Sequence, residues 1–119
     1  HGDVAVIREA KRQKLVCVPG VATPTEAFAG LDADADGLKM FPAEMLPPAV
    51  VKAWLAVLPK GTKLYPVGGI TPDGMAAYRA AGVAGFGLGS ALYKAGLSAA
   101  EVGVNARAFA AAWTGRAVA

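Results

Sequence analysis

Four short apolar segments recur along the chain and restrict the folds open to it. They cover residues 15–18, 38–41, 64–67 and 85–88, and their first residues lie 21 to 26 positions apart. Apart from one lysine, the segments are continuously apolar rather than alternating, which is typical of parallel strands covered on both faces. The spacing has the length of a strand followed by a helix. The pattern therefore predicts an α/β fold with parallel strands and right-handed connections.

Helix signals occupy the intervals between these segments. Thr23 and Glu26 have the spacing of a capping box, with Pro24 at the first helical position. Ser98 and Glu101 repeat this spacing before an alanine-rich stretch. By these and similar signals, the five expected helices begin after Asp3, Thr23, Pro47, Thr71 and Ser98. Strands and helices are therefore expected to alternate along the whole chain.

Strand–helix units of this kind build either an open doubly wound sheet or a (β/α)₈ barrel. A complete barrel requires about 250 residues, and about 200 at the least. This chain has 119 residues, which is too few for two ordinary domains. In the barrel interpretation, four units make half of a barrel. In that interpretation, residues 1–119 form one partial domain.

Composition excludes several classes of protein. With 55% hydrophobic and 18% charged residues, the chain is expected to fold rather than to be disordered. No apolar run approaches the roughly 20 residues of a membrane helix. The formal net charge is only +3, and the basic residues are scattered, so we expect neither a membrane nor a nucleic-acid partner. The single cysteine, Cys17, permits no internal disulfide and fits a cytoplasmic location.

Three acidic residues at alternate positions resemble the start of a calcium-binding loop. Asp32, Asp34 and Asp36 precede a glycine, but the twelfth position of such a loop requires a bidentate glutamate and here is Ala43. Lys39 would also place a cation inside the loop. We therefore interpret the acidic residues as a polar turn before a buried strand and expect no metal.

Lys39 is the one charged residue of an otherwise apolar segment. Because side chains alternate along a strand, Lys39 and Phe41 share one face, which in a barrel points inward. An amine held away from water loses its proton more readily, and a neutral amine can attack a ketone to form a Schiff base. Alternatively, the lysine extends to solvent from the end of the sheet or protects an edge strand. The pattern alone leaves both interpretations open.

Two glycine-containing turns follow the third and fourth apolar segments. Gly68 and Gly69 come just before the helix start at Thr71, while Gly89 and Ser90 end the segment GLGS. Exposed backbone N–H groups at such turns favour an anion, and phosphate sites in barrels are typically formed by the loops after strands 7 and 8. The two turns together predict a phosphate site, although ordinary tight turns also use glycine. A dinucleotide-binding fingerprint is rejected, because the third glycine of GFGLGS is misplaced and no acidic residue lies about 20 positions further on.

The chain resembles the class I 2-keto-3-deoxy-6-phosphogalactonate and -gluconate aldolases. The segments that carry the resemblance are VPGVATPTEAF, GLKMFPAE, YPVGGITPDGM and GFGLGSALYKAG. They match the C-terminal half of that family's (β/α)₈ barrel, strands 5–8, so the resemblance implies that residues 1–119 are a partial barrel domain with its N-terminal half missing. Valine before the glycine pair is closer to the galactonate branch, because the gluconate enzymes usually carry threonine there. The resemblance implies that Lys39 is the Schiff-base lysine, and it implies substrate or phosphate contacts from Pro19, Gly20, Phe41, Gly68, Gly69, Gly89 and Ser90.

The resemblance also implies a reaction. A phosphorylated keto sugar acid would form an imine with Lys39 and be cleaved to glyceraldehyde 3-phosphate and pyruvate. The family is usually a homotrimer and uses no metal and no organic cofactor. Its general acid/base glutamate, a carboxylate-binding arginine and a threonine lie in the N-terminal half. We therefore expect these 119 residues alone to show little or no turnover, and we expect their two unpaired sheet edges to favour association.

Three other functions stay open from the sequence. The substrate could be the gluconate epimer, which differs from the galactonate compound at one hydroxyl. The chain could belong to another phosphate-binding barrel, such as a thiamine-phosphate-synthase-like or isomerase-like protein, which would not need Lys39. It could also be a phosphate-ligand-binding module without catalytic activity.

Overall fold

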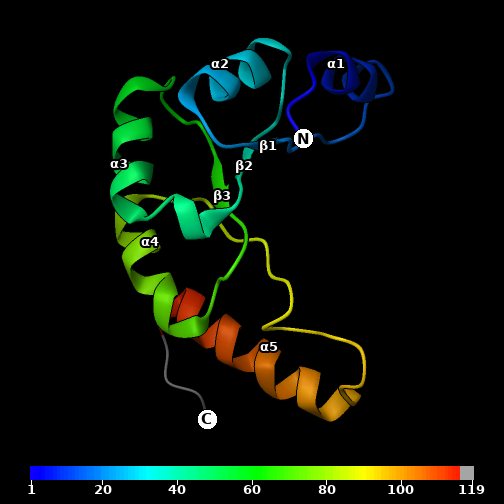
Figure 1. The fold of residues 1–119 in the computed structure, drawn as a ribbon, viewed down its shortest axis with the longest axis vertical. Helices are drawn as coiled ribbons and strands as arrows, with labels where there is room; N and C mark the ends of the chain where they lie inside the picture. Colours follow the sequence, from blue (N-terminus) through cyan, green and yellow to red (C-terminus); the bar gives the residue numbers. More distant parts are fainter. Residues whose placement is uncertain (116–119) are drawn as a thin grey trace.

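The computed structural model describes residues 1–115 (Figure 1). In chain order the elements are α1 (Val4–Arg12), β1 (Gly20–Val21), α2 (Pro24–Asp32), β2 (Leu38–Met40), η1 (Ala43–Met45), α3 (Pro48–Val57), β3 (Leu64–Pro66), η2 (Pro72–Gly74), α4 (Met75–Ala81) and α5 (Ala99–Thr114). The strands form one parallel sheet in the order β1-β2-β3. In this register Lys39 pairs with Gly20 on one side and with Tyr65 on the other. The predicted α/β fold with parallel strands is confirmed.

The fourth apolar segment lies beside β3 but forms little regular strand. The Ala84 N–H donates to the Leu64 carbonyl at 2.9 Å, and the Gly87 N–H donates to the Pro66 carbonyl at 3.0 Å. Val67 and Gly87 form an isolated parallel bridge. The fourth apolar segment is therefore parallel to β3, as predicted. The predicted strand over residues 85–88 is reduced to this single bridge, because among residues 1–115 no further strand pairs with its outer edge.

The position predicted for the first strand was wrong. Residues 15–18 are not assigned to a strand, and Leu15, Val16 and Val18 are 53%, 81% and 40% exposed. Strand pairing begins at Gly20 instead. The physical reason is the place of this segment at the edge of the sheet, where no strand of the described residues covers its outer side. Its apolar side chains therefore remain in contact with solvent.

Helices α1, α2 and α5 begin at their predicted caps, whereas the segment after Thr71 begins as the 3₁₀ turn η2 without a side-chain cap bond and α4 begins only at Met75. The Asp3 carboxylate accepts hydrogen bonds from two backbone N–H groups at the start of α1, and the Thr23 hydroxyl accepts one from the N–H of Glu26. Ser98 and Glu101 form a complete capping box at the start of α5. Each of these side chains satisfies N–H groups that the helix leaves without partners. Local sequence chemistry therefore determines where these helices begin.

The core lies between the sheet and the helices that follow its strands. Leu38 and Met40 of β2 and Leu64 of β3 are fully buried, and they form one cluster with Val51 and Trp54 of α3. In Figure 1, α2, α3 and α4 follow one another along this side of the strands, while α1 and α5 lie at opposite ends. None of the described helices is both long and apolar enough to span a membrane.

The molecule is more open than a compact domain of its length. Its Cα radius of gyration is 15.3 Å, against about 13.5 Å expected for a compact chain of this size.

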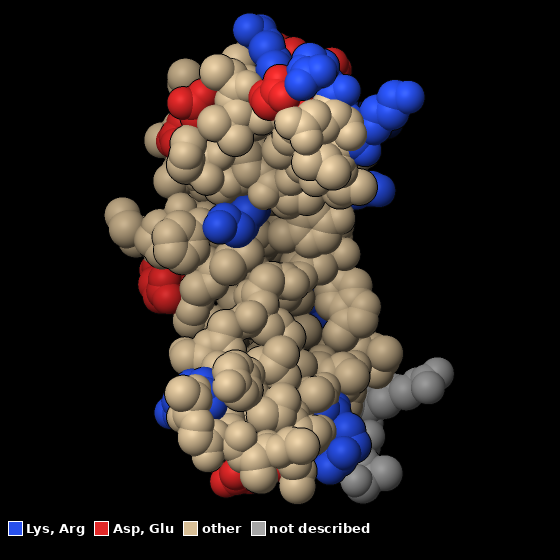
Figure 2. All heavy atoms as spheres, turned by 90° about the vertical axis from the view of Figure 1, so that its right-hand side faces the viewer, with Lys and Arg blue, Asp and Glu red and all other residues tan. Residues whose placement is uncertain are grey.

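Figure 2 shows the side of the sheet opposite to α3: basic side chains gather at the end that carries α1, and the surface over the middle is mostly uncharged. One face of the sheet is therefore packed against helices, and the other is accessible.

Candidate active site

Lys39 extends from the middle of β2 toward the accessible face of the sheet. Its neighbours Leu38 and Met40 are fully buried against the helices, whereas Lys39 is half-buried. The Lys39 Nζ lies 5.1 Å from the centroid of the Phe41 ring, a distance at which a cation is attracted to the ring face. Lysine and phenylalanine thus share one face, as strand alternation predicted.

The neighbouring strand β1 leaves room for the lysine side chain. A Cβ on Gly20 would lie 3.0 Å from Lys39 Cε and 3.7 Å from Nζ, so a larger residue there would press on the amine. Pro19 is buried, and its carbonyl accepts a hydrogen bond from the Lys39 N–H at 2.8 Å. These two predicted site residues therefore contact Lys39 from the side.

A cavity of about 360 Å³ lies over the lysine and is open to solvent. It includes six of the eight predicted site residues: Lys39, Phe41, Gly68, Gly69, Gly89 and Ser90. The structure therefore brings the amine together with both glycine turns. Lys39 is the only charged residue among the described residues that line this cavity.

Sequence reasoning missed several residues that line the same cavity, including Val67 and Gly87. A signal for Val67 was available. Tyr65 pairs with Lys39 in the sheet, and alternation along the strand places Val67 on the same face as Tyr65. The position of Gly87 at this cavity follows from the parallel pairing of the fourth apolar segment with the segment of β3.

Two larger hollows, of about 640 and 410 Å³, lie elsewhere, against α4 and α5. The larger one is lined by Arg79 and Trp113, whose guanidinium carbon and ring centroid are 5.9 Å apart, and the smaller one is mainly apolar. Neither hollow is lined by Lys39 or by a glycine turn. The cavity over Lys39 is therefore the better candidate for covalent chemistry, despite its smaller size.

The first glycine turn needs glycine at both positions. Gly68 has φ = +108° and Gly69 has φ = +65°, values that side-chain-bearing residues rarely adopt. The space for a side chain is also occupied, because a Cβ on Gly69 would lie 2.7 Å from Glu44 Oε1. A side chain at either position would point toward Glu44, so the turn presents backbone to the cavity lined by Lys39.

Glu44 lies on the other side of this turn from Lys39. Together with Tyr78 it lines a separate small cavity of about 80 Å³, and the glycine pair forms the wall shared by the two cavities. The Tyr78 hydroxyl lies 3.1 Å from the Ala43 carbonyl oxygen and 3.0 Å from that of Leu46. Burial, and secondly the charge of Glu44, raise the pKa of Tyr78. Glu44 is thus placed to act on the turn and not on the amine.

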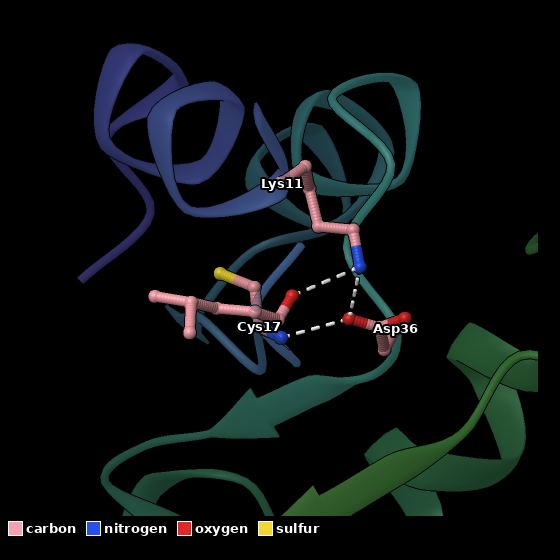
Figure 3. Close-up of polar contacts among 4 residues, drawn as sticks. Lys11, Cys17 and Asp36 are labelled. Atoms are coloured by element: carbon pink, nitrogen blue, oxygen red, sulfur yellow. Dashed lines mark hydrogen bonds and ion pairs between the residues drawn. The ribbon is translucent and has the colours of Figure 1, made fainter. Parts of the chain in front are cut away.

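Asp36, the last acidic residue before β2, makes a structural contact (Figure 3). Asp36 Oδ2 accepts a hydrogen bond from Lys11 Nζ at 2.7 Å and another from the Cys17 N–H at 2.7 Å. Both hydrogen bonds, chiefly the one from Lys11, hold the pKa of the Asp36 carboxyl group below its usual value. Within residues 1–115, no group of three or more His, Cys, Asp and Glu side chains is arranged to hold a metal ion. Asp36 therefore connects the end of α1 to the loop before β2.

Comparison with known proteins agrees with this arrangement. The sequence model of the family described as "KDPG and KHG aldolase" matches residues 3–109. The probable 2-dehydro-3-deoxy-6-phosphogalactonate aldolase of Rhizobium meliloti (strain 1021) is 49% identical over 111 residues, which are 93% of this chain and 52% of that protein. The 2-dehydro-3-deoxy-6-phosphogalactonate aldolase of Escherichia coli (strain K12) is 45% identical over 108 residues, 91% of this chain and 53% of that protein.

The chain thus spans about half the length of the curated relatives it matches. A solved structure described as "Native KDPGal structure" has a TM-score of 0.92 and 43% sequence identity, and the match covers 95% of this chain and 55% of that one. The family match extends over most of the sequence, and the fold agrees with it. The chain therefore belongs to the KDPG and KHG aldolase family.

Proposed function

We propose that the protein acts as a class I aldolase that cleaves 2-dehydro-3-deoxy-6-phosphogalactonate to pyruvate and D-glyceraldehyde 3-phosphate, with Lys39 as the Schiff-base lysine. The observation that carries this proposal is the cavity in which Lys39 faces both glycine turns. The galactonate substrate is favoured because two relatives named for it are 49% and 45% identical to this chain. Val67 before the glycine pair agrees with the same branch.

The proposed reaction begins at the amine. The neutral Lys39 Nζ adds to the C2 carbonyl of the substrate, and uptake of a proton with loss of water gives a protonated imine. As the C4 hydroxyl loses its proton, the C3–C4 bond breaks, its electron pair moves toward the imine nitrogen, and glyceraldehyde 3-phosphate leaves. The remaining enamine takes up a proton at C3. Water then hydrolyses the imine, which releases pyruvate and restores the free amine.

The two glycine turns would hold the phosphate at the far end of the substrate. Gly68, Gly69 and Gly89 provide exposed backbone, and Ser90 adds a hydroxyl group at the same cavity. Binding energy from the phosphate then places the reacting carbons next to Lys39, which is how remote contacts lower a reaction barrier. No cofactor is required by this scheme.

The described cavity supplies the amine but no carboxylate for the proton of the C4 hydroxyl. Lys39 is the only charged residue among its described lining residues, and Glu44 lies behind the glycine turn. We therefore propose that these 119 residues alone form the imine but show little or no turnover. We also propose that the protein is cytoplasmic and forms a homotrimer, as the family usually does. Sedimentation analysis tests the oligomeric state.

Borohydride trapping tests the proposal directly. The chain is incubated with pyruvate and sodium borohydride, and the modified peptide is identified by mass spectrometry. We expect the mass of one reduced pyruvate on Lys39, no such adduct in Lys39→Ala, and an undiminished adduct in Lys52→Ala, which removes an exposed lysine on α3. Failure of the wild-type chain to form an adduct at Lys39 would overturn the proposal.

A further inference from the structure

Glu44 is in contact with the glycine turn that we propose to bind phosphate. Its Oε1 lies 2.7 Å from the position of a Cβ on Gly69, and its Oε2 lies 3.0 Å from that of a Cβ on Gly68. Glu44 lines the small cavity on one side of the turn, while Lys39 lines the large cavity on the other. A negative charge is thus placed against the back of the turn.

The segment that carries Glu44 is held in this position from two sides. The Ala43 N–H donates to the Val67 carbonyl at 2.8 Å, which joins η1 to the residue before the glycine pair. The Tyr78 hydroxyl lies within hydrogen-bonding distance of the Ala43 and Leu46 carbonyl oxygens. The backbone of η1 therefore cannot move away from the turn without losing these contacts.

The cavity offers no cation where the two turns meet. Gly68, Gly69 and Gly89 contribute only backbone groups, and Ser90 contributes a neutral hydroxyl. Lys39, the one charged residue among the described lining residues, is engaged with the substrate ketone in the proposed function. A phosphate dianion would therefore be held by neutral donors, with the carboxylate of Glu44 behind them.

We propose that Glu44 sets the phosphate affinity of the turn: its charge, acting through Gly68 and Gly69, weakens the binding of a phosphate dianion in the Lys39 cavity. This inference rests on the proposed function, since it takes the two glycine turns as the phosphate site. Weak phosphate binding favours departure of the phosphorylated product, and product release often limits turnover. Tighter binding of the phosphate group would not accelerate the chemical step if it stabilised the bound substrate and the transition state equally.

The experiment compares wild type with Glu44→Gln, which removes the charge and keeps the shape of the side chain. Inorganic phosphate is titrated into ¹⁵N-labelled protein, and the amide resonances of Gly68 and Gly69 report binding. Asp32→Asn is the matched control, because it removes the same charge from an exposed position at the end of α2. The spectra also show that each variant is folded.

We expect Glu44→Gln to bind phosphate about two- to fivefold more tightly than wild type at about 0.1 M ionic strength, as like-charge repulsion through a hydrated turn predicts. The difference should shrink at about 1 M, where the Debye length is only about 3 Å. Asp32→Asn should bind phosphate as wild type does. This salt dependence separates a charge effect from mechanical support of the turn.

Equal or weaker binding by Glu44→Gln would overturn the inference, and so would the absence of phosphate-dependent shifts at the turn in both proteins. Borohydride trapping is independent of this result, because pyruvate carries no phosphate. Trapping at Lys39 with no effect of Glu44→Gln would overturn this inference alone. Tighter phosphate binding by Glu44→Gln without any trapping would overturn the proposed function alone.

Discussion

Replacing Gly87 by alanine should destabilise the protein, because its Cβ would collide with Val67. The built Cβ lies 2.5 Å from Val67 Cγ2 and 3.1 Å from Cγ1, and real Cβ atoms essentially never approach another atom within 3.0 Å. Val67 cannot yield easily. Its side chain is branched at Cβ and stiff at χ1, and its N–H donates to the Met40 carbonyl at 3.0 Å. The Gly87 segment would therefore have to move away from β3.

The cost can be estimated against a control two residues along the same segment. Overpacking of this kind costs about 1–3 kcal/mol of unfolding free energy. A Cβ on Gly89 has no atom within 4 Å, and Gly89 does not have a positive φ. Gly89→Ala should therefore stabilise by about 0.4–1 kcal/mol, through the lower entropy of the unfolded chain. The two variants should differ by about 1–4 kcal/mol.

Urea unfolding followed by circular dichroism measures this difference, with the midpoint compared at an unchanged m-value. Gly87→Ala should unfold at a lower urea concentration than wild type, and Gly89→Ala at an equal or higher one. In a Val67→Ala background, which removes both clashing methyl groups, Gly87→Ala should cost less. Coincident midpoints for the two alanine variants would refute the reasoning, since steric contact with Val67 is the feature that distinguishes these glycines.

Three further changes test other contacts of the structure. Gly20→Ala would bring a Cβ within 3.0 Å of Lys39 Cε, so we expect slower borohydride trapping with little change in the urea midpoint. Tyr78→Phe removes a part-buried hydroxyl that lies near two backbone carbonyls, and urea unfolding should show a loss of about 0.5–1.5 kcal/mol. Asp36→Asn removes the negative charge that pairs with the Lys11 ammonium group. Because the pKa of Asp36 is lowered in the folded state, its stabilising effect is complete above the unfolded-state pKa and is lost as pH falls through the folded-state value. The advantage of wild type over Asp36→Asn in urea should therefore be constant near neutral pH and shrink below about pH 4.

Local chemistry was sufficient to predict the starts of α1, α2 and α5. Thr23, Ser98 and Asp3 each satisfy N–H groups within the next three residues, so the information needed lies within one helical turn. The end of α1 was less predictable. It stops at Arg12, and Lys14 two residues later adopts a positive φ of 60° that does not continue a helix.

The burial of a strand depends on neighbours that are distant in sequence. Residues 38–41 and 15–18 have similar apolar character, yet Leu38 is fully buried whereas Val16 is 81% exposed. The difference is position in the sheet, since β2 lies between two strands and residues 15–18 lie at the edge. An apolar segment therefore predicts that the chain tends to bury it. Only the order of strands in the sheet determines whether a neighbouring strand is present to cover it.

The candidate site combines both kinds of information. Alternation along β2 was enough to place Lys39 and Phe41 on one face. The contact of Glu44 with the glycine turn was not predicted, because it joins the loop after β2 to the loop after β3. Carboxyl ends of neighbouring parallel strands meet at one edge of a sheet, and this rule applied to η1 and Gly68 would have placed them together.

Each parallel segment contributes a different component to the proposed site. β1 provides space at Gly20, β2 provides the amine of Lys39, and the turns after β3 and Gly87 provide exposed backbone for an anion. Because sequence order equals spatial order, these components lie in a row, with the amine next to β1 and the anion site at the far end. A substrate with a ketone at one end and a phosphate at the other matches this polarity. Imine formation and phosphate binding then depend on separate parts of the cavity, which is why pyruvate and inorganic phosphate can probe them one at a time.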